Sequence, residues 1–253
     1  MSRTYDLLAR VYDTPDHLEI TESFHRAVRP LVRTRPRGTW VLDLACGTGV
    51  LAERLGRAGV PVVGVDGSRE MLAIARRRCR AHGDRVRLRR GDLATFSVRE
   101  PCSLATASGD VMNHMLSKSA LVRVLRRIRR NLLPGGALVF EAHDRFAYEQ
   151  YWDGHDYFME GEGGDLAMSC EWDGRRGLAT VRMVGYARVG RTGRRHEKVE
   201  TTLTERWWSD AALRAALREA GFARIWRAPW SPWPDQHTQP AIDRALWSAR
   251  VPG

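Results

Sequence analysis

Cysteine is scarce in this sequence, and its spacing excludes two kinds of small stabilised fold. The 253 residues contain four cysteines, and no two of them form a C-x-x-C pair. A disulfide framework needs a dense set of cysteines in a secreted chain, and a structural zinc site needs paired ligands. The eight histidines form no H-E-x-x-H pattern, so we expect no metal. We predict free thiols at Cys46, Cys79, Cys102 and Cys170.

Long apolar runs are also absent. No stretch approaches the roughly 20 consecutive apolar residues that cross a bilayer, and residues 1–10 contain no apolar signal segment. We therefore expect no membrane partner and a cytoplasmic location. The hydrophobic fraction is 43%, which is ordinary for a chain that forms a packed core.

Lysine is nearly missing from a strongly basic chain. Lys118 and Lys198 are the two lysines among 41 basic residues, and the formal net charge is +11. Such a charge raises nucleic acid as a partner, because phosphates bind clustered Lys and Arg. The arginine runs at 76–80 and 123–130 lie in amphipathic stretches, however, and are most simply the solvent faces of helices. We therefore do not expect nucleic acid as the partner.

The first 143 residues alternate short apolar runs with amphipathic stretches, which is the pattern of a βαβ chain. The amphipathic stretches predict helices at 50–57, 69–82 and 119–132. The apolar runs are buried on both faces if they form strands, so we expect a mostly parallel sheet covered by helices. These strands are predicted at 41–45, 61–66, 86–89, 103–107 and 137–142.

A β-rich segment follows the fifth strand. Antiparallel strands are predicted at 168–172, 178–189 and 196–207, with turns at 173–174 and 190–193. A helix at 209–220, capped by Ser209, and strands at 222–227 and 241–251 around a turn-rich stretch at 229–240 then return to the main sheet. We predict an α/β core with an N-terminal helical cap over 1–145, an antiparallel β insertion over 146–208, and a return to the core sheet over 209–253.

The segment after the first strand carries the strongest chemical signal. Gly47 and Gly49 permit a tight turn and a close approach of a ligand to the start of the next helix. Residues 47–52 also satisfy G-x-G-x-x-A, so a nicotinamide or flavin enzyme is an open alternative. Asp43 favours another ligand, because a carboxylate beside the loop repels a pyrophosphate and attracts an ammonium or sulfonium.

Acidic residues end three successive strands. Asp66 lies 19 residues after Gly47, where an acid can accept both hydroxyls of a ribose. Asp92 follows the third strand, where it can accept from an adenine amine while Leu93 packs on the ring. One such acid is commonly a loop cap, but three at neighbouring strand ends favour a nucleoside ligand.

Four motifs in this order resemble class I S-adenosylmethionine-dependent methyltransferases, over roughly 39–142. They are Leu-Asp-Leu-Ala-Cys-Gly-Thr-Gly (42–49), Val-Asp-Gly-Ser (65–68), Gly-Asp-Leu (91–93) and Leu-Leu-Pro-Gly-Gly (132–136). The resemblance implies a Rossmann-like seven-stranded sheet in the order 3-2-1-4-5-7-6 with an antiparallel last strand. It also implies S-adenosylmethionine as the cofactor, and the residues expected to contact it are Tyr12, Asp43, Ala45, Gly47, Gly49, Asp66, Gly67, Met71, Asp92, Leu93 and Ser108.

The acceptor side should lie at the carboxyl ends of the fourth and fifth strands, where ligands bind in open α/β sheets. His114 is the best candidate for a proton acceptor, because an imidazole titrates near neutral pH. Tyr5 and Tyr12 lie seven residues apart and are predicted on one face of an N-terminal helix, with Tyr5 on the acceptor side. The residues expected to contact the acceptor are Asn113, His143 and Trp152.

Residues 146–174 contain eight acids, several aromatic residues and no Lys or Arg in an otherwise basic chain. Acids interleaved with aromatic rings suit a cationic amine and not a phosphate backbone. We predict methyl transfer to the amine nitrogen of a small molecule, as in the antibiotic-pathway N-methyltransferases of actinobacteria that the chain resembles. The insertion would be a lid or the contact of a homo-oligomer, with Glu160, Glu162 and Asp165 selecting the amine. An O-methyltransferase and an RNA methyltransferase are the alternatives.

Overall fold

The computed structural model describes residues 2–190, 195–232 and 244–253. Its main sheet has seven strands in the order β3-β2-β1-β4-β5-β11-β10, and β11 runs antiparallel to both of its neighbours. The predicted fold class and strand order are therefore confirmed. The strands are β1 (Trp40–Leu44), β2 (Val62–Asp66), β3 (Val86–Arg90), β4 (Cys102–Ala107), β5 (Leu132–His143), β10 (Ala223–Trp230) and β11 (Arg244–Arg250).

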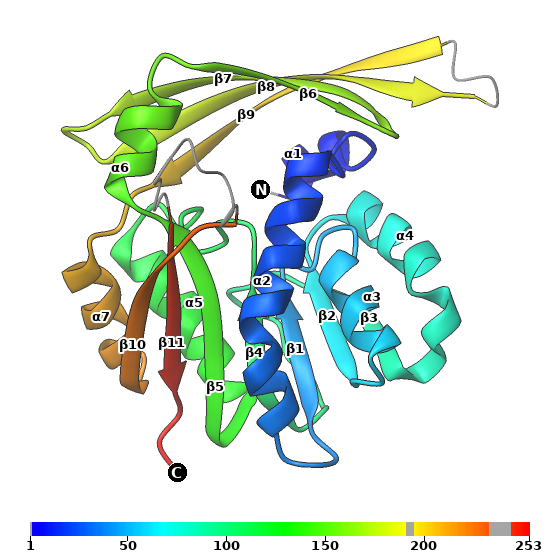
Figure 1. Ribbon diagram of the computed structural model, residues 1–253. Coiled ribbons are helices and arrows are strands. Elements are labelled where there is room, and N and C mark those ends of the chain that lie inside the picture. Colours follow the sequence, from blue (N-terminus) through cyan, green and yellow to red (C-terminus); the bar gives the residue numbers. More distant parts are fainter. Residues whose placement is uncertain (1, 191–194, 233–243) are drawn as a thin grey trace.

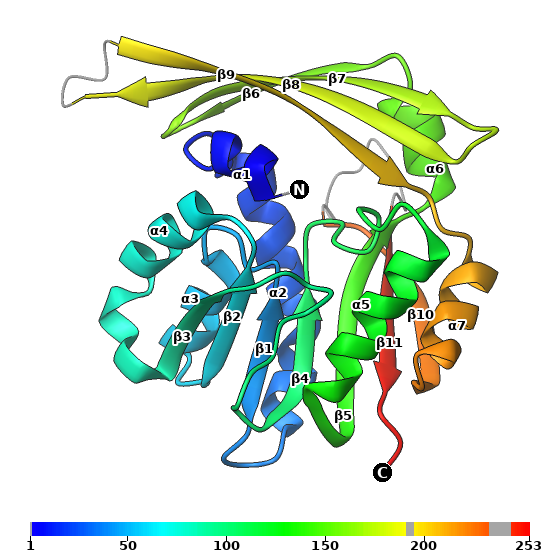
Figure 2. The same cartoon turned by 180° about the vertical axis from the view of Figure 1, so that it is seen from behind.

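Helices cover both faces of this sheet. Helices α2 and α3 pack on one face through residues such as Phe24 and Leu55 (Figure 1), and α5 and α7 pack on the other through residues such as Leu125 and Leu217 (Figure 2). The predicted helix at 69–82 ends at Arg78 and continues as a 3₁₀ helix at Arg80–Arg85, in which Gly83 takes a φ of 54°. The helices are α2 (Pro15–Thr34), α3 (Val50–Arg57), α4 (Arg69–Arg78), α5 (Lys118–Arg130) and α7 (Asp210–Glu219).

The insertion forms a second antiparallel sheet in the order β6-β7-β8-β9. Its strands are β6 (Asp156–Gly161), β7 (Gly164–Asp173), β8 (Leu178–Val189) and β9 (Arg195–Arg206). The sequence analysis did not predict β6. Apolar side chains that point inward alternate along it with side chains that point outward, but it has an acid near each end. The predicted turn at 190–193, the stretch 229–240 and the start of the last strand fall largely outside the described residues.

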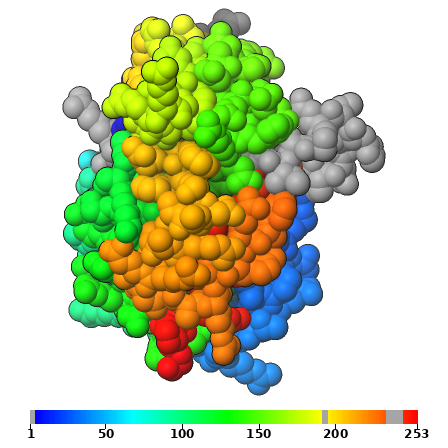
Figure 3. Space-filling model, turned by 90° about the vertical axis from the view of Figure 1, so that its left-hand side faces the viewer, coloured from blue at the N-terminus to red at the C-terminus, as the bar shows by residue number. Residues whose placement is uncertain are grey.

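The second sheet lies across the carboxyl ends of the parallel strands, with the short helix α1 (Ser2–Leu8) beneath it (Figures 1 and 2). The short α6 (Arg145–Ala147) and a π-helical turn at Tyr148–Trp152 connect β5 to it. Seen from the side, the second sheet sits directly above α7 and β10 (Figure 3). A covered space is thus created where an open α/β sheet binds its ligands.

The N-terminal prediction is wrong in one respect. Helix α1 ends at Leu8, and Tyr12 lies in the turn before α2. A second helix begins at Pro15, where the Thr14 hydroxyl accepts from the His17 backbone N–H. The two tyrosine rings still meet edge to face, with centroids 5.9 Å apart. In the part of the chain described here, no helix is both long and apolar enough to cross a membrane.

Candidate active site

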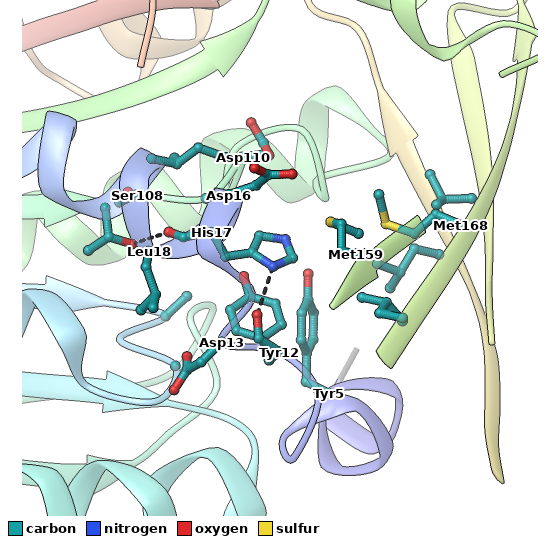
Figure 4. A pocket seen from close by; sticks show the side chains of 18 of the residues that line it. Tyr5, Tyr12, Asp13, Asp16, His17, Leu18, Ser108, Asp110, Met159 and Met168 are labelled. Atoms are coloured by element: carbon teal, nitrogen blue, oxygen red, sulfur yellow. Dashed lines mark hydrogen bonds between the residues drawn. The ribbon is translucent and has the colours of Figure 1, made fainter. Parts of the chain in front are cut away.

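Two cavities meet above the carboxyl ends of β1 and β4. The side cavity, about 580 Å³, follows the ends of β2 and β3, and the upper cavity, about 440 Å³, lies beneath the second sheet. Figure 4 shows the upper cavity, with Met159 and Met168 of the second sheet facing Tyr5. The residues that line both cavities are Tyr5, Tyr12, Ala45, Gly47, Ser108, Gly109 and His114. Any reaction between ligands in the two cavities must take place among these side chains.

The loop after β1 is held in shape by Asp66. One carboxylate oxygen accepts from the Gly47 backbone N–H at 2.9 Å and the other from the Ser68 N–H at 2.7 Å. Ala45 and Gly47 take left-handed conformations, with φ of 49° and 53°. A Cβ on Gly47 would find no atom closer than Ala45 O at 3.9 Å, so this position borders open space. The loop therefore borders the cavity with backbone atoms.

Gly49 serves a different purpose from the one predicted. It lines neither cavity, and a Cβ built on it would lie 2.9 Å from the Ala75 Cβ of α4. The glycine lets the start of α3 pack against α4. Its φ of 82° also suits the residue that precedes the helix.

Asp43 lies at the bottom of the upper cavity and is 2% exposed. Thr106 donates to its Oδ1 at 3.1 Å, whereas Oδ2 has no hydrogen-bond partner among the described residues. Burial raises the pKa of Asp43 to about 7. A cationic ligand group beside Oδ2 would favour the ionised carboxylate and satisfy the buried oxygen.

The side cavity contains the predicted nucleoside contacts. Asp66, Gly67, Met71, Asp92 and Leu93 all line it, together with Ser108 at the junction. Asp92 accepts from the Ala94 backbone N–H at 2.7 Å, which fixes the turn that carries Leu93. The cavity thus combines an apolar wall with two carboxylates at its rim, which suits a purine and a ribose.

Tyr5 and His114 form a pair at the junction of the cavities. The Tyr5 hydroxyl oxygen and His114 Nε2 lie 2.8 Å apart and share a hydrogen bond. Burial lowers the pKa of His114 to about 4 and raises the pKa of Tyr5 well above its usual value. At neutral pH the pair is therefore an uncharged imidazole and a protonated phenol, and the imidazole can accept a proton.

Acids behind this pair form a buried charged cluster. Arg244 donates to Asp110 and, at 2.8 Å, to Glu141, while His143 Nε2 lies 3.2 Å from Asp110. Burial alone would raise the pKa of Asp110, but Arg244 and His143 hold it well below its usual range. Asp110, His143 and Arg244 line the upper cavity. The ionised Asp110 therefore adds negative potential on the acceptor side.

Glu205 is the acid that the sequence prediction missed. It extends from β9 into the upper cavity, accepts from the Tyr148 hydroxyl at 2.9 Å, and lies 3.9 Å from His114 Nε2. It is 4% exposed, and burial followed by the charge of Asp110 raises its pKa to about 8. A signal was present in the sequence, because strand alternation places Glu205 on the same face as the apolar Leu203.

The predicted acceptor contacts divide into two groups. His143 and Trp152 line the upper cavity, with ring centroids 4.9 Å apart. Asn113 is fully buried and lines neither cavity. Its amide donates to Arg206 O at 2.9 Å and accepts from the His143 N–H at 3.3 Å, so it fastens β9 to the main sheet.

The acids predicted to select the amine do not face the cavity. Glu160 and Glu162 are exposed, and the Asp165 side chain lies 3.9 Å from Arg188. Strand alternation explains the error, because in β6 and β7 the neighbours of these acids, Met159 and Leu166, point inward.

The residues described here include no group of three or more His, Cys, Asp or Glu side chains that could hold a metal ion.

Comparison with known proteins extends the resemblance. Residues 41–136 match the family model described as a methyltransferase domain. A dTDP-4-amino-2,3,4,6-tetradeoxy-D-glucose N,N-dimethyltransferase from Saccharopolyspora spinosa is 36% identical over 156 residues, or 56% of this chain and 61% of that protein. A dTDP-3-amino-3,6-dideoxy-alpha-D-glucopyranose N,N-dimethyltransferase from Streptomyces fradiae is 33% identical over 53% of this chain and 52% of its own length. The matches thus span about half to three fifths of these relatives.

Solved structures match nearly the whole chain. The CcbJ methyltransferase from Streptomyces caelestis has a TM-score of 0.75 at 20% identity, covering 99% of this chain and 98% of the other. An amino pentose methyltransferase from Micromonospora echinaspora has a TM-score of 0.65 at 22% identity, covering 92% and 91%. Residues 41–136 are therefore similar to a methyltransferase domain, and the chain has the fold of the S-adenosylmethionine-dependent methyltransferases whose structures it matches.

Proposed function

We propose that this protein transfers a methyl group from S-adenosylmethionine to the amine nitrogen of a small molecule. One observation carries the proposal: two cavities of different chemistry meet at the Tyr5–His114 pair. The side cavity suits a nucleoside, and the upper cavity contains the buried acids Asp110 and Glu205. Such an arrangement brings a methyl donor and a cationic acceptor together at one place.

The cofactor residues fit their proposed ligand. Asp66, Met71, Asp92 and Leu93 would hold the adenosine part, and Asp43 the methionine end, where an unpartnered buried oxygen requires a donor. When bound, S-adenosylmethionine supplies an electrophilic methyl group on a positively charged sulfur. The protein's part is to orient the acceptor toward that methyl and to exclude water from it.

The acceptor nitrogen must lose a proton, because an ammonium has no free lone pair. Asp110 would attract the cation, as would Glu205 once the cation beside it favours the ionised carboxylate, and the uncharged His114 imidazole would accept a proton from the ammonium before the freed lone pair attacks the methyl group. Tyr5 would hold the imidazole in position. A phenolate or carboxylate acceptor would be repelled by the same acids, which favours an amine over an anionic oxygen acceptor.

The relatives suggest the first acceptors to test. The two curated relatives are named as N,N-dimethyltransferases of amino sugars. We therefore propose an amino sugar or a related secondary-metabolite amine, with the second sheet serving as a lid. The cytoplasmic location, the homo-oligomer through the insertion and the division at 145/146 and 208/209 stay predictions.

A transfer assay tests the function. The purified protein would be incubated with S-adenosylmethionine labelled on the methyl group and with a panel of amino sugars and phenols, and the products read by mass spectrometry. We expect a mass gain on nitrogen and none on phenolic oxygen. Calorimetry with S-adenosylhomocysteine and with nicotinamide cofactors tests the ligand separately. Methylation of phenols alone, or binding of a nicotinamide cofactor alone, would contradict the proposal.

A further inference from the structure

The underside of the second sheet forms a continuous apolar wall over the upper cavity. Register brings these side chains to one face, because Tyr157, Met168 and Met183 are direct cross-strand neighbours, as are Cys170, Val181 and Leu203. All six line the cavity, and Met159 and Leu166 extend the wall (Figure 4). Such a wall offers a ligand mainly dispersion contacts.

An acidic side chain, that of Glu205, lies at the inner end of this wall. Glu205 follows Leu203 on the inward face of β9 and lies against Tyr148 and His114. The cavity therefore has a carboxylate at the transfer point and a thioether and aliphatic lining further out. A ligand that matches it carries a cation at one end and an apolar body behind it.

Positive charge for a phosphate is lacking. Among the described residues that line the upper cavity, Arg244 is the single lysine or arginine, and it already binds Asp110 and Glu141. A pyrophosphate placed against methionines and beside Asp110 would lose its hydration without gaining a charged partner.

We propose that the acceptor is an amine on an apolar body without phosphates, bound with its ammonium toward Glu205 and its body against the methionine wall of the second sheet. This rests on the proposed N-methylation and narrows it. The acceptor class differs from the nucleotide-linked sugars in the names of the two relatives. An amino sugar already attached to an apolar aglycone, in place of its nucleotide, is one member of this class. A glycosyl transfer would then precede methylation.

A binding comparison tests the acceptor class without turnover. The protein loaded with S-adenosylhomocysteine would be titrated by calorimetry with two forms of the same aminodideoxy sugar, its phenyl glycoside and its thymidine diphosphate ester. We expect the phenyl glycoside to bind at least about tenfold more tightly. Equal or tighter binding of the diphosphate ester, or no binding of the glycoside, would overturn the proposal.

Variants of the wall give the matched controls. Met168→Gln keeps the length of the side chain but places a polar amide against the apolar body, and we expect it to weaken glycoside binding at least about threefold. Met168→Lys should weaken it further, because it places a charge against the apolar body of the ligand. Phe158→Lys adds the same charge on the outer face, where Phe158 is 66% exposed, and should leave binding unchanged. S-adenosylhomocysteine affinity reports whether each variant is folded.

The outcomes separate this inference from the proposed function. If the glycoside binds but gains no methyl on nitrogen in the transfer assay, N-methylation fails while the preference of the cavity stands. If the diphosphate ester is the better ligand and is methylated on nitrogen, the proposed function stands and this inference fails. Unchanged glycoside affinity in both Met168 variants would also contradict it.

Discussion

A substitution of Asp43 tests whether its carboxylate contacts the cofactor. Asp43→Asn keeps an acceptor for Thr106 but replaces the unpartnered oxygen by an amide. We expect S-adenosylhomocysteine to bind about tenfold to a hundredfold more weakly, the loss typical of a charge-assisted hydrogen bond. Calorimetry of both proteins measures this. An unchanged affinity of Asp43→Asn for S-adenosylhomocysteine would show that Asp43 does not contact the cofactor.

The same substitution has a consequence for stability. Burial raises the pKa of Asp43 from 3.8 to about 7, so the folded state holds this proton more tightly than the unfolded chain does. The contribution of Asp43 to the free energy of unfolding therefore falls as pH rises from about 4 to about 7. In Asp43→Asn this contribution is absent. Denaturant unfolding at pH 5 and pH 8 should show a smaller loss of stability in the variant than in the wild type.

His114 tests the proton-transfer step. With its pKa lowered to about 4 by burial, the acid limb of kcat/KM that belongs to His114 should lie near pH 4, and not near the usual value of 6.5. His114→Ala should remove that limb and lower kcat about a hundredfold, with unchanged affinity for S-adenosylhomocysteine. A fall of less than tenfold with an unaltered pH profile would leave His114 as a residue that only shapes the cavity.

Alanine substitutions at two glycines test the packing of α3 against α4. Gly49 and Gly59 both take positive φ, of 82° and 78°, but only Gly49 has a neighbour that an added Cβ would strike. Alanine at either position strains the backbone, and at Gly49 it also overpacks the contact with Ala75. We expect Gly49→Ala to destabilise the protein by about 1–3 kcal/mol more than Gly59→Ala, measured by urea unfolding. Equal losses would contradict this account of Gly49.

Among the secondary-structure elements, periodicity predicted α3, α4, α5, α7 and most strands, but it missed α2 and β6 and misplaced the end of α1. The strand β6 was missed because a six-residue strand with acids in it is recognised only by its pairing with β7. The helix α1 was predicted to include Tyr12, because a spacing of seven fits a helical face. The structure brings Tyr5 and Tyr12 together by a turn instead.

The distribution of acids over the whole molecule reverses one prediction made from the sequence, namely that the outer acids select the amine. Neutralising Glu160, Glu162 and Asp165 together should leave KM for the amine within about twofold, because exposed charges are screened. Glu205→Gln should raise KM at least about tenfold, because a buried carboxylate acts in a less polar surrounding. Steady-state kinetics at low ionic strength compares the two. A large rise in KM for the amine in the triple variant would instead show that the outer acids select the amine.

The pH dependence of acceptor binding separates Glu205 from its neighbours. Glu205 faces Tyr148 and His114, and the charges of Asp110, His143 and Arg244 act on it. Because its pKa is raised to about 8, the carboxylate forms as pH rises, and affinity for a protonated amine should increase from pH 6 to pH 8. Glu205→Gln should lose most of this slope in a titration by calorimetry. A slope that persists in the variant would assign it to another group.

Local patterns in the sequence predicted the strands of the main sheet and the composition of the nucleoside side of the site, and the family resemblance of its motifs implied the strand order. These depend on local patterns, since apolar strands, a glycine turn and an acid after each strand follow one another along 96 residues that match one family model. The sequence placed His114, His143 and Trp152 on the acceptor side, but only the tertiary structure showed which acids join them there. Glu205 and His114 come from segments 91 residues apart, and Asp110 and Arg244 from segments 134 residues apart. The charges that face the acceptor depend on how the second sheet is placed over the first, and alternation along a strand cannot say which face will be covered.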